Sequence, residues 1–112
     1  MQNRPQQALY YEETWSNMWK KIKEQWDKGY RVIDIEYGSG TWVTTFNESD
    51  IQQSIYYKKT WEDLWKKIKE KWDEDYRITD IEYGNGTWIV TLDKTDTQHK
   101  RQPYTSPQEW EK

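Results

Sequence analysis

The chain has 112 residues, enough for one compact domain, and its low apolar share of 33% rests largely on nine Trp and nine Tyr. The formal net charge of −3 lacks the basic excess of nucleic-acid binders, so we do not expect nucleic acid as a partner. The absence of Cys excludes disulfides and thiolate metal sites. No apolar run is long enough to span a membrane and no leader pattern is visible, so we expect a cytoplasmic protein.

An internal repeat dominates the sequence. Residues 9–46 align without a gap on residues 55–92, at an offset of 46 residues, and 23 of the 38 aligned pairs are identical. Such a period is typical of a supersecondary unit that buries its apolar face against its own copy. We predict a flexible N-terminal arm over 1–8, repeat 1 over 9–54 and repeat 2 over 55–100. Residues 101–112 then form a C-terminal tail, or a partial third repeat that caps the stack.

Each repeat contains an amphipathic helix. Apolar residues recur at helical spacing in both copies, at Trp15, Met18, Trp19, Ile22 and Trp26, and at Trp61, Leu64, Trp65, Ile68 and Trp72. Thr14 and Thr60 directly precede these stripes and are predicted to be N-caps. Gly29 suits the left-handed residue that follows a helix, whereas Asp75 at the equivalent position tolerates that geometry less well, so we expect the second helix to end differently.

A β-hairpin follows each helix. Asn85-Gly86 strongly indicates a two-residue type I′ turn, and Ser39-Gly40 indicates one more weakly. The turn predicts a register in which one sheet face meets the Trp stripe of the helix. The predicted pairs on that face are Tyr37–Trp42, Ile35–Thr44 and Ile33–Phe46, with Tyr83–Trp88, Ile81–Val90 and Thr79–Leu92 in the second copy.

A third strand is predicted after each hairpin, over 52–57 and 98–104, and residues 8–11 are its unpaired N-terminal equivalent. The predicted fold class is α+β, with two tandem repeats of a helix plus an antiparallel β-hairpin or meander. The repeats have a period of 46 residues and pack as one domain with pseudo-symmetry. The Trp residues of the helices, together with Trp42 and Trp88, are expected to fill its core.

Two segments of the second copy, IKEKWDEDYRITDI (68–81) and YGNGTWIV (83–90), resemble a repeat module of unknown function. That Trp-rich helix–hairpin module has the approximate pattern IKEKWDEGYxITSIAYGNGxWxVV. It occurs in bacterial multidomain proteins, including Ser/Thr kinases, and a related form follows the catalytic domain of plant casein-kinase-I-like kinases. The resemblance implies an accessory, non-catalytic module. This chain departs from the pattern at Asp34, Glu36, Asp80 and Glu82, where the family usually has small residues.

The sequence gives little support for catalysis. His99 is the only His and has no partner at a diagnostic spacing, so we predict no catalytic residue, metal site or cofactor. Carboxylates at i and i+2 on a strand share a face and leave paired acid–base chemistry as the one option. The pair Asp34 and Glu36 recurs in the second repeat as Asp80 and Glu82, and catalytic sites seldom occur twice in so small a domain.

The acidic sheet face has two readings, which the sequence leaves open. It is either a solvated face whose charges discourage aggregation, or a surface for a protein partner that would be basic. We predict a partner-binding surface formed by Tyr30, Asp34, Glu36, Tyr76, Asp80 and Glu82. Further aromatic contacts are predicted at Tyr10, Tyr11, Tyr56, Tyr57 and Trp110.

The predicted function is that of a non-enzymatic protein-interaction module, a small soluble adaptor or inhibitor. One alternative is a small-ligand or carbohydrate-binding protein that uses the exposed Tyr and Trp side chains. Another is an inhibitor of a host factor encoded by a phage or mobile element. Open sheet edges also predict self-association, most simply as a twofold homodimer.

Overall fold

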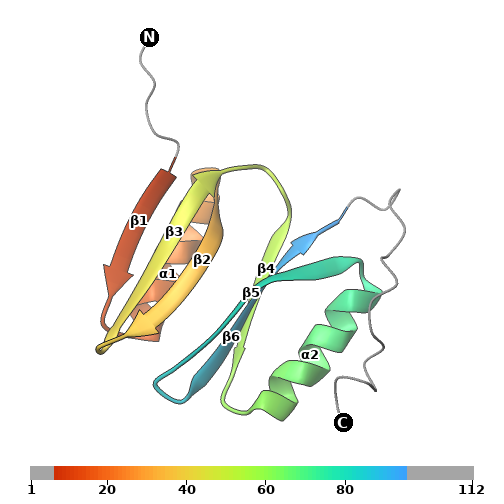
Figure 1. Cartoon of the computed structure of the whole chain (residues 1–112). Helices are drawn as coiled ribbons and strands as arrows, with labels where there is room; N and C mark the ends of the chain where they lie inside the picture. The colour runs from red at the N-terminus through yellow and green to blue at the C-terminus, as the bar shows by residue number, and fades with distance from the viewer. Residues whose placement is uncertain (1–6, 96–112) are drawn as a thin grey trace.

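A computed structural model describes residues 7–95 as two similar units, each with one helix and one three-stranded antiparallel sheet (Figure 1). The elements in chain order are β1 (Gln7–Glu12), α1 (Trp15–Asp27), β2 (Tyr30–Gly38), β3 (Thr41–Glu48), β4 (Gln53–Lys58), α2 (Trp61–Asp73), β5 (Tyr76–Gly84) and β6 (Thr87–Lys94). The predicted α+β fold with two repeats is confirmed. The strand predicted at 98–104, the tail with Trp110, and His99 lie outside the described residues.

The local signals behave as the sequence predicts, with one exception. The Thr14 and Thr60 hydroxyls accept hydrogen bonds from the backbone N–H groups of Asn17 and Asp63, both at 3.1 Å, so both N-caps are confirmed. Asp75 is the exception, because it adopts the left-handed conformation at φ +69° and ends α2 just as Gly29, at φ +91°, ends α1. Both hairpin turns carry two residues with positive φ, as type I′ requires.

The third strand of each sheet precedes the helix instead of following the hairpin. Sheet A has the order β1-β3-β2 and sheet B the order β4-β6-β5. Residues 8–11 were predicted to be unpaired, which is wrong, because β1 pairs with β3 over its whole length. The strand at 53–58 likewise pairs with β6 and belongs to repeat 2. Within the described residues each unit therefore begins with a strand, β1 from Gln7 and β4 from Gln53.

A β-bulge shifts the register of both hairpins. Val32 lies opposite Phe46 and Asp34 opposite Thr45, so Ile33 drops out of the ladder, and Thr79 does so in sheet B. The predicted pairs Ile33–Phe46 and Thr79–Leu92 are therefore wrong, whereas those nearer the turns are confirmed. Because side chains alternate between faces, the extra residue moves Tyr30 and Tyr76 to the helix side of their sheets.

Aromatic and aliphatic side chains fill two cores, one on each side of sheet B. The first lies between α1 and sheet A and extends to Ile55 and Ile89 of sheet B. The second lies between α2 and sheet B and is built around Leu64, Ile68 and Leu92. Seven of the eight Trp residues predicted for the core are buried or half-buried, while Trp61 is exposed. The repeats are thus stacked, with the outer face of sheet B, the face turned away from α2, packed against repeat 1.

Candidate functional site

Aromatic rings form one part of the contact between the two repeats, which we call the joint. The ring of Tyr57, on the outer face of sheet B, lies 5.5 Å from the rings of both Trp15 and Trp19 on α1, in edge-on arrangements. Ile55 and Ile89 from the same face are buried beside these rings. The outer face of sheet B thus covers the Trp stripe of the preceding helix.

Gln53 links the two repeats with three hydrogen bonds to repeat 1 and is held within repeat 2 by a fourth. Its side-chain oxygen accepts from the backbone N–H of Val32 at 2.8 Å and from the indole N–H of Trp26 at 3.0 Å. Its amide nitrogen donates to the Val32 carbonyl at 3.0 Å and to Asp93 Oδ1 at 2.7 Å. The Gln53 side chain therefore acts towards Val32 as a neighbouring strand would, by engaging both backbone groups.

Asp80 and Glu82 accept hydrogen bonds from the backbone N–H groups at the edge of β2. The Asp80 carboxylate accepts a hydrogen bond from the Ile35 backbone N–H, and the Glu82 carboxylate accepts one from the Tyr37 backbone N–H, both at 2.9 Å. β2 and β5 lie side by side without forming a common ladder (Figure 1). The spacing of two residues matches carboxylates on one face of β5 to the alternate N–H groups of an edge strand. These side chains therefore have a structural role in the joint.

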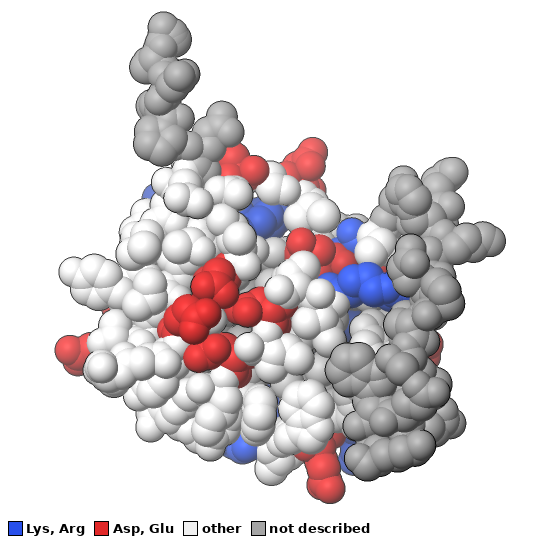
Figure 2. Space-filling view, viewed as in Figure 1, with Lys and Arg blue, Asp and Glu red and all other residues white. Residues whose placement is uncertain are grey.

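Four carboxylates gather where β2 and β5 meet, and Figure 2 shows acidic side chains clustered there. Burial raises the pKa of Asp80 to about 6; the Ile35 N–H opposes this, while Asp34 and Glu82 add to it. Repulsion, chiefly from Asp34 and then from Glu82, also raises the pKa of Glu36. Among the described residues, no group of carboxylates or histidines is arranged to hold a metal ion.

The raised pKa of Asp80 predicts that the protein gains stability on mild acidification. A carboxyl group whose pKa is higher in the folded state than its ordinary value of 3.8 binds more protons when folded, so stability falls as pH rises towards about 6. Asp80 is only half-buried, so after solvent screening the gain from pH 7 to pH 5 is about 1 kcal/mol. We expect the Tm to rise by about 4–8 °C over that interval.

Asp80→Asn tests this expectation, because asparagine keeps an acceptor for the Ile35 N–H and removes the charge. The variant should melt above the parent protein at pH 7 and lose most of the pH dependence. Asp50→Asn, in an exposed loop, is the matched control and should change neither. A parent protein that melts lower at pH 5 than at pH 7 would contradict the prediction.

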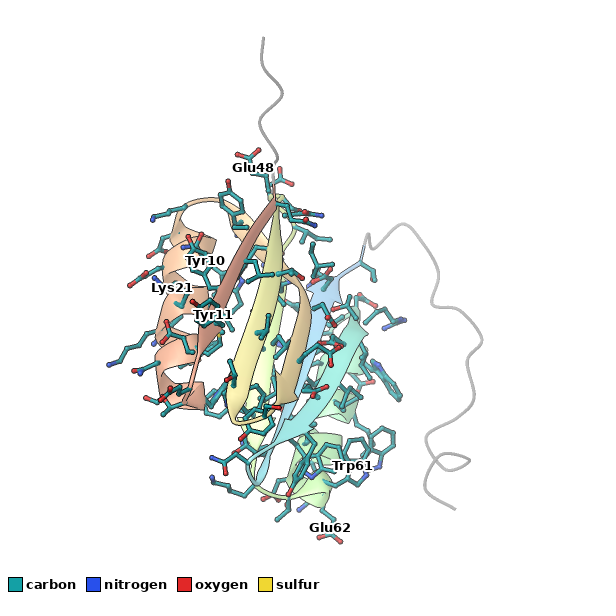
Figure 3. All side chains as sticks on the ribbon, turned by 60° about the vertical axis from the view of Figure 1, so that its left-hand side comes forward. Tyr10, Tyr11, Lys21, Glu48, Trp61 and Glu62 are labelled. Carbon is teal, nitrogen blue, oxygen red and sulfur yellow. The ribbon has the colours of Figure 1, made fainter. Side chains whose placement is uncertain are left out.

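Sheet A has an outer face equivalent to the one that sheet B uses in the joint, and no described residue of the chain covers its apolar side chains. We call it the open face and define it by Gln7, Leu9, Tyr11, Asp34, Glu36, Gly38 and Val43. Tyr10 turns to the helix side, with Lys21 Nζ 4.8 Å from its ring centre, whereas Tyr11 from the same strand is exposed (Figure 3). The open face therefore combines apolar, aromatic and acidic groups.

The structure separates the six residues predicted as a partner-binding surface. Tyr76 is buried in the core beneath α2 and Tyr30 packs against α1, so neither shares a face with the carboxylates, which corrects the prediction. Asp80 and Glu82 are engaged in the joint, while Asp34 and Glu36 lie on the open face. Sequence reasoning missed Leu9 and Gly38, although their alignment with Ile55 and Gly84 was the signal that could have identified them.

The remaining aromatic candidates also divide by face. Tyr56, like Tyr10, lies on the helix side, with Lys67 Nζ 5.0 Å from its ring centre. Tyr57 is partly exposed and borders a pocket of about 710 Å³ at the joint. The pocket is lined by Trp15, Ser16, Trp19, Tyr57, Lys58, Lys59, Asp63, Asn85 and Thr87. It presents ring faces beside amino, hydroxyl and carboxylate groups.

Within residues 7–95 no helix is long and apolar enough to cross a membrane. Comparison of the chain with protein-family models, with curated proteins and with solved structures found no match. The resemblance to the Trp-rich helix–hairpin module therefore stays a prediction from the sequence.

Proposed function

We propose that this chain is a non-enzymatic protein-recognition module and that the open face is its binding surface. One observation carries the proposal. Leu9 and Tyr11 stand exposed on the open face, whereas their equivalents Ile55 and Tyr57 cover a helix of the neighbouring repeat. A concentration of exposed apolar side chains of this kind is typical of protein interaction sites.

The joint indicates what kind of partner the open face suits. Its equivalent on sheet B receives an amphipathic helix with a Trp stripe and an edge strand whose N–H groups need acceptors. The open face offers the same combination. Leu9, Tyr11 and Val43 can pack against the Trp rings of a partner helix, and Asp34 and Glu36 can accept hydrogen bonds from its N–H donors. The carboxylates also favour a basic segment over an acidic one. The proposed ligand class is thus an amphipathic, Trp-bearing helix with donor groups beside it.

A peptide of residues 14–28 is the probe for this proposal. It contains the α1 stripe that sheet B already receives, with four Lys against two acidic residues. Titrated into the ¹⁵N-labelled full chain, it should produce saturable amide shifts at Leu9, Tyr11 and Val43. Asp34→Lys with Glu36→Lys should weaken binding about tenfold or more, because two favourable charge contacts become repulsive.

Two controls make the titration decisive. Glu24→Lys with Asp27→Lys makes the same change of charge in the same repeat, at exposed positions of α1 on the other side of sheet A from the open face, and should leave the affinity within about twofold. A peptide in which all three Trp residues are replaced by Ala should not bind. The absence of saturable shifts on the open face, or equal effects of the two charge reversals, would contradict the proposal.

A second candidate function is the binding of a small ligand or carbohydrate. The observation that favours it is the joint pocket, where Trp15, Trp19 and Tyr57 provide ring faces and Lys59 provides a donor. An oligosaccharide held there should change the intrinsic Trp fluorescence in a saturable way. The peptide titration and the fluorescence titration report on different surfaces, so they separate the two candidates.

A further inference from the structure

We propose that the partner of the open face is a second copy of this chain, docked head to tail, so that the contact between copies repeats the joint within each copy. This inference rests on the proposed function, because it names the partner of the same surface. The contact joins two different ends of the molecule. One is the open face of repeat 1, and the other is the far end of repeat 2, which we call the α2 end and define by Trp61, Ile81 and Tyr83.

Among the described residues, five of the seven exposed large hydrophobic side chains lie at these two ends, and the other two are Ile33 in the bulge and Tyr57 at the joint. On the open face, Leu9 is 56% exposed and Tyr11 is 69% exposed, against 5% and 41% for Ile55 and Tyr57 at the joint. Three-dimensional position decides this difference, since the residues are equivalent in the repeat.

The α2 end shows the same imbalance in the opposite direction. Ile81 is 37% exposed while its equivalent Ile35 is fully buried, and Tyr83 is half-exposed while Tyr37 packs in the core. Trp61 is also exposed, and it lies on α2, remote from sheet A (Figure 3). Each end thus exposes the counterparts of residues that the joint covers.

A glycine at each hairpin provides a steric match. At the joint Gly84 lies against the Tyr37 side chain so closely that a Cβ there would be 2.4 Å from Tyr37 Cγ. Its equivalent Gly38 on the open face has open space at the same point. Tyr83 on the α2 end corresponds to Tyr37. The ring of Tyr83 from a second copy can therefore pack over Gly38 without a steric clash.

The carboxylates supply the polar half of the same contact. Ile35 and Tyr37 direct their N–H groups away from β3, because they donate to Asp80 and Glu82 of the other repeat. Ile81 and Tyr83 hold the same register against β6, opposite Val90 and Trp88. Their N–H groups therefore point out of the edge of β5. Asp34 and Glu36 of a second copy have the spacing needed to accept from both.

This contact is heterologous, so its geometry differs from that of a twofold dimer. Each copy presents one open face and one α2 end, and a bound pair still has one of each free. Association therefore continues into a chain of copies or closes into a ring of more than two. The predicted twofold homodimer, by contrast, would stop at two copies.

The test is the mass in solution of the full 112-residue chain, measured by sedimentation at concentrations up to about 1 mM. We expect the mean mass to grow beyond that of a dimer as concentration rises. Gly38→Ala should weaken association at least about tenfold. The new Cβ contacts nothing in the single chain, but in the assembly it would clash with the Tyr83 ring of the second copy.

Complementation distinguishes head-to-tail from twofold association. Gly38→Ala blocks the open face and leaves the α2 end intact, while Tyr83→Asp blocks the α2 end and leaves the open face intact. Each variant alone should be a monomer, and an equimolar mixture should form a one-to-one heterodimer that grows no further. Circular dichroism and thermal melts of both variants confirm that they are folded.

Several outcomes would overturn the inference. These are a wild-type chain that stays monomeric at every concentration, a dimer that is insensitive to Gly38→Ala, or a mixture of variants that fails to pair. If the α1 peptide binds the open face while the chain stays monomeric, the proposed function stands and the second copy is not the partner. If neither associates, both proposals fail.

Discussion

Replacing Ile55 by alanine is expected to lower the free energy of unfolding by about 2–5 kcal/mol. Ile55 lies on the outer face of sheet B and is nearly fully buried in the core that connects the two repeats. Truncation removes buried methyl groups and leaves a cavity, because the rings of Trp15 and Trp19 are held by their own contacts and cannot fill the space. Urea denaturation followed by Trp fluorescence measures the change.

Leu9→Ala is the matched control, since Leu9 is the equivalent of Ile55 on the open face. Most of its surface is already in water, so we expect a change of no more than about 0.5 kcal/mol at dilute protein concentration. The difference between the two variants measures what stacking contributes at this position. Equal costs at the two positions would show that the outer face of sheet B is not packed against repeat 1 in solution.

Gly84→Ala is expected to destabilise the protein by about 1–3 kcal/mol, the usual cost of an overpacked contact. The new methyl group would lie 2.4 Å from Tyr37 Cγ, and the Tyr37 ring is itself held 4.6 Å from the ring of Trp42. Either the ring leaves its place or the two repeats separate at this edge, so that the Glu82 contact with the Tyr37 N–H is strained as well. Thermal melts and amide exchange at Tyr37 report the two effects.

Gly38→Ala separates this steric effect from the general effect of replacing a glycine. Neither glycine has a positive φ, and the Cβ at position 38 meets nothing within 4 Å. We expect this variant to be neutral or slightly more stable, because alanine reduces the freedom of the unfolded chain by about 0.4–1 kcal/mol. If Gly38→Ala destabilised the dilute protein as much as Gly84→Ala, the close contact at the joint would not be the cause.

The acidic residues show how one sequence motif acquires two roles. Asp34 with Glu36 and Asp80 with Glu82 are identical pairs at equivalent positions, so no local property distinguishes them. The second pair accepts hydrogen bonds from the edge of β2, while the first lies on the open face. Only the order of stacking makes the difference, because repeat 2 has a neighbour on its outer face and repeat 1 has none among the described residues.

Features that depend on near neighbours in the chain can be predicted from the amino-acid sequence. The repeat, the helical Trp stripes, the Thr14 and Thr60 caps and the glycine-containing turns are all set by the spacing and chemistry of adjacent residues. The bulge was the main local feature missed, because a run of alternating residues carries no mark of one extra position, and Tyr30 and Tyr76 were placed on the wrong face as a result.

The sequence does not reveal which strand joins which sheet, which face of each sheet is covered, or which residues remain exposed. These are contacts between segments far apart in the chain, and the competing arrangements bury similar side chains. Ile55 and Leu9 are aliphatic residues at equivalent positions of the two repeats, so the burial of one and the exposure of the other follow from position in the stack and not from residue type.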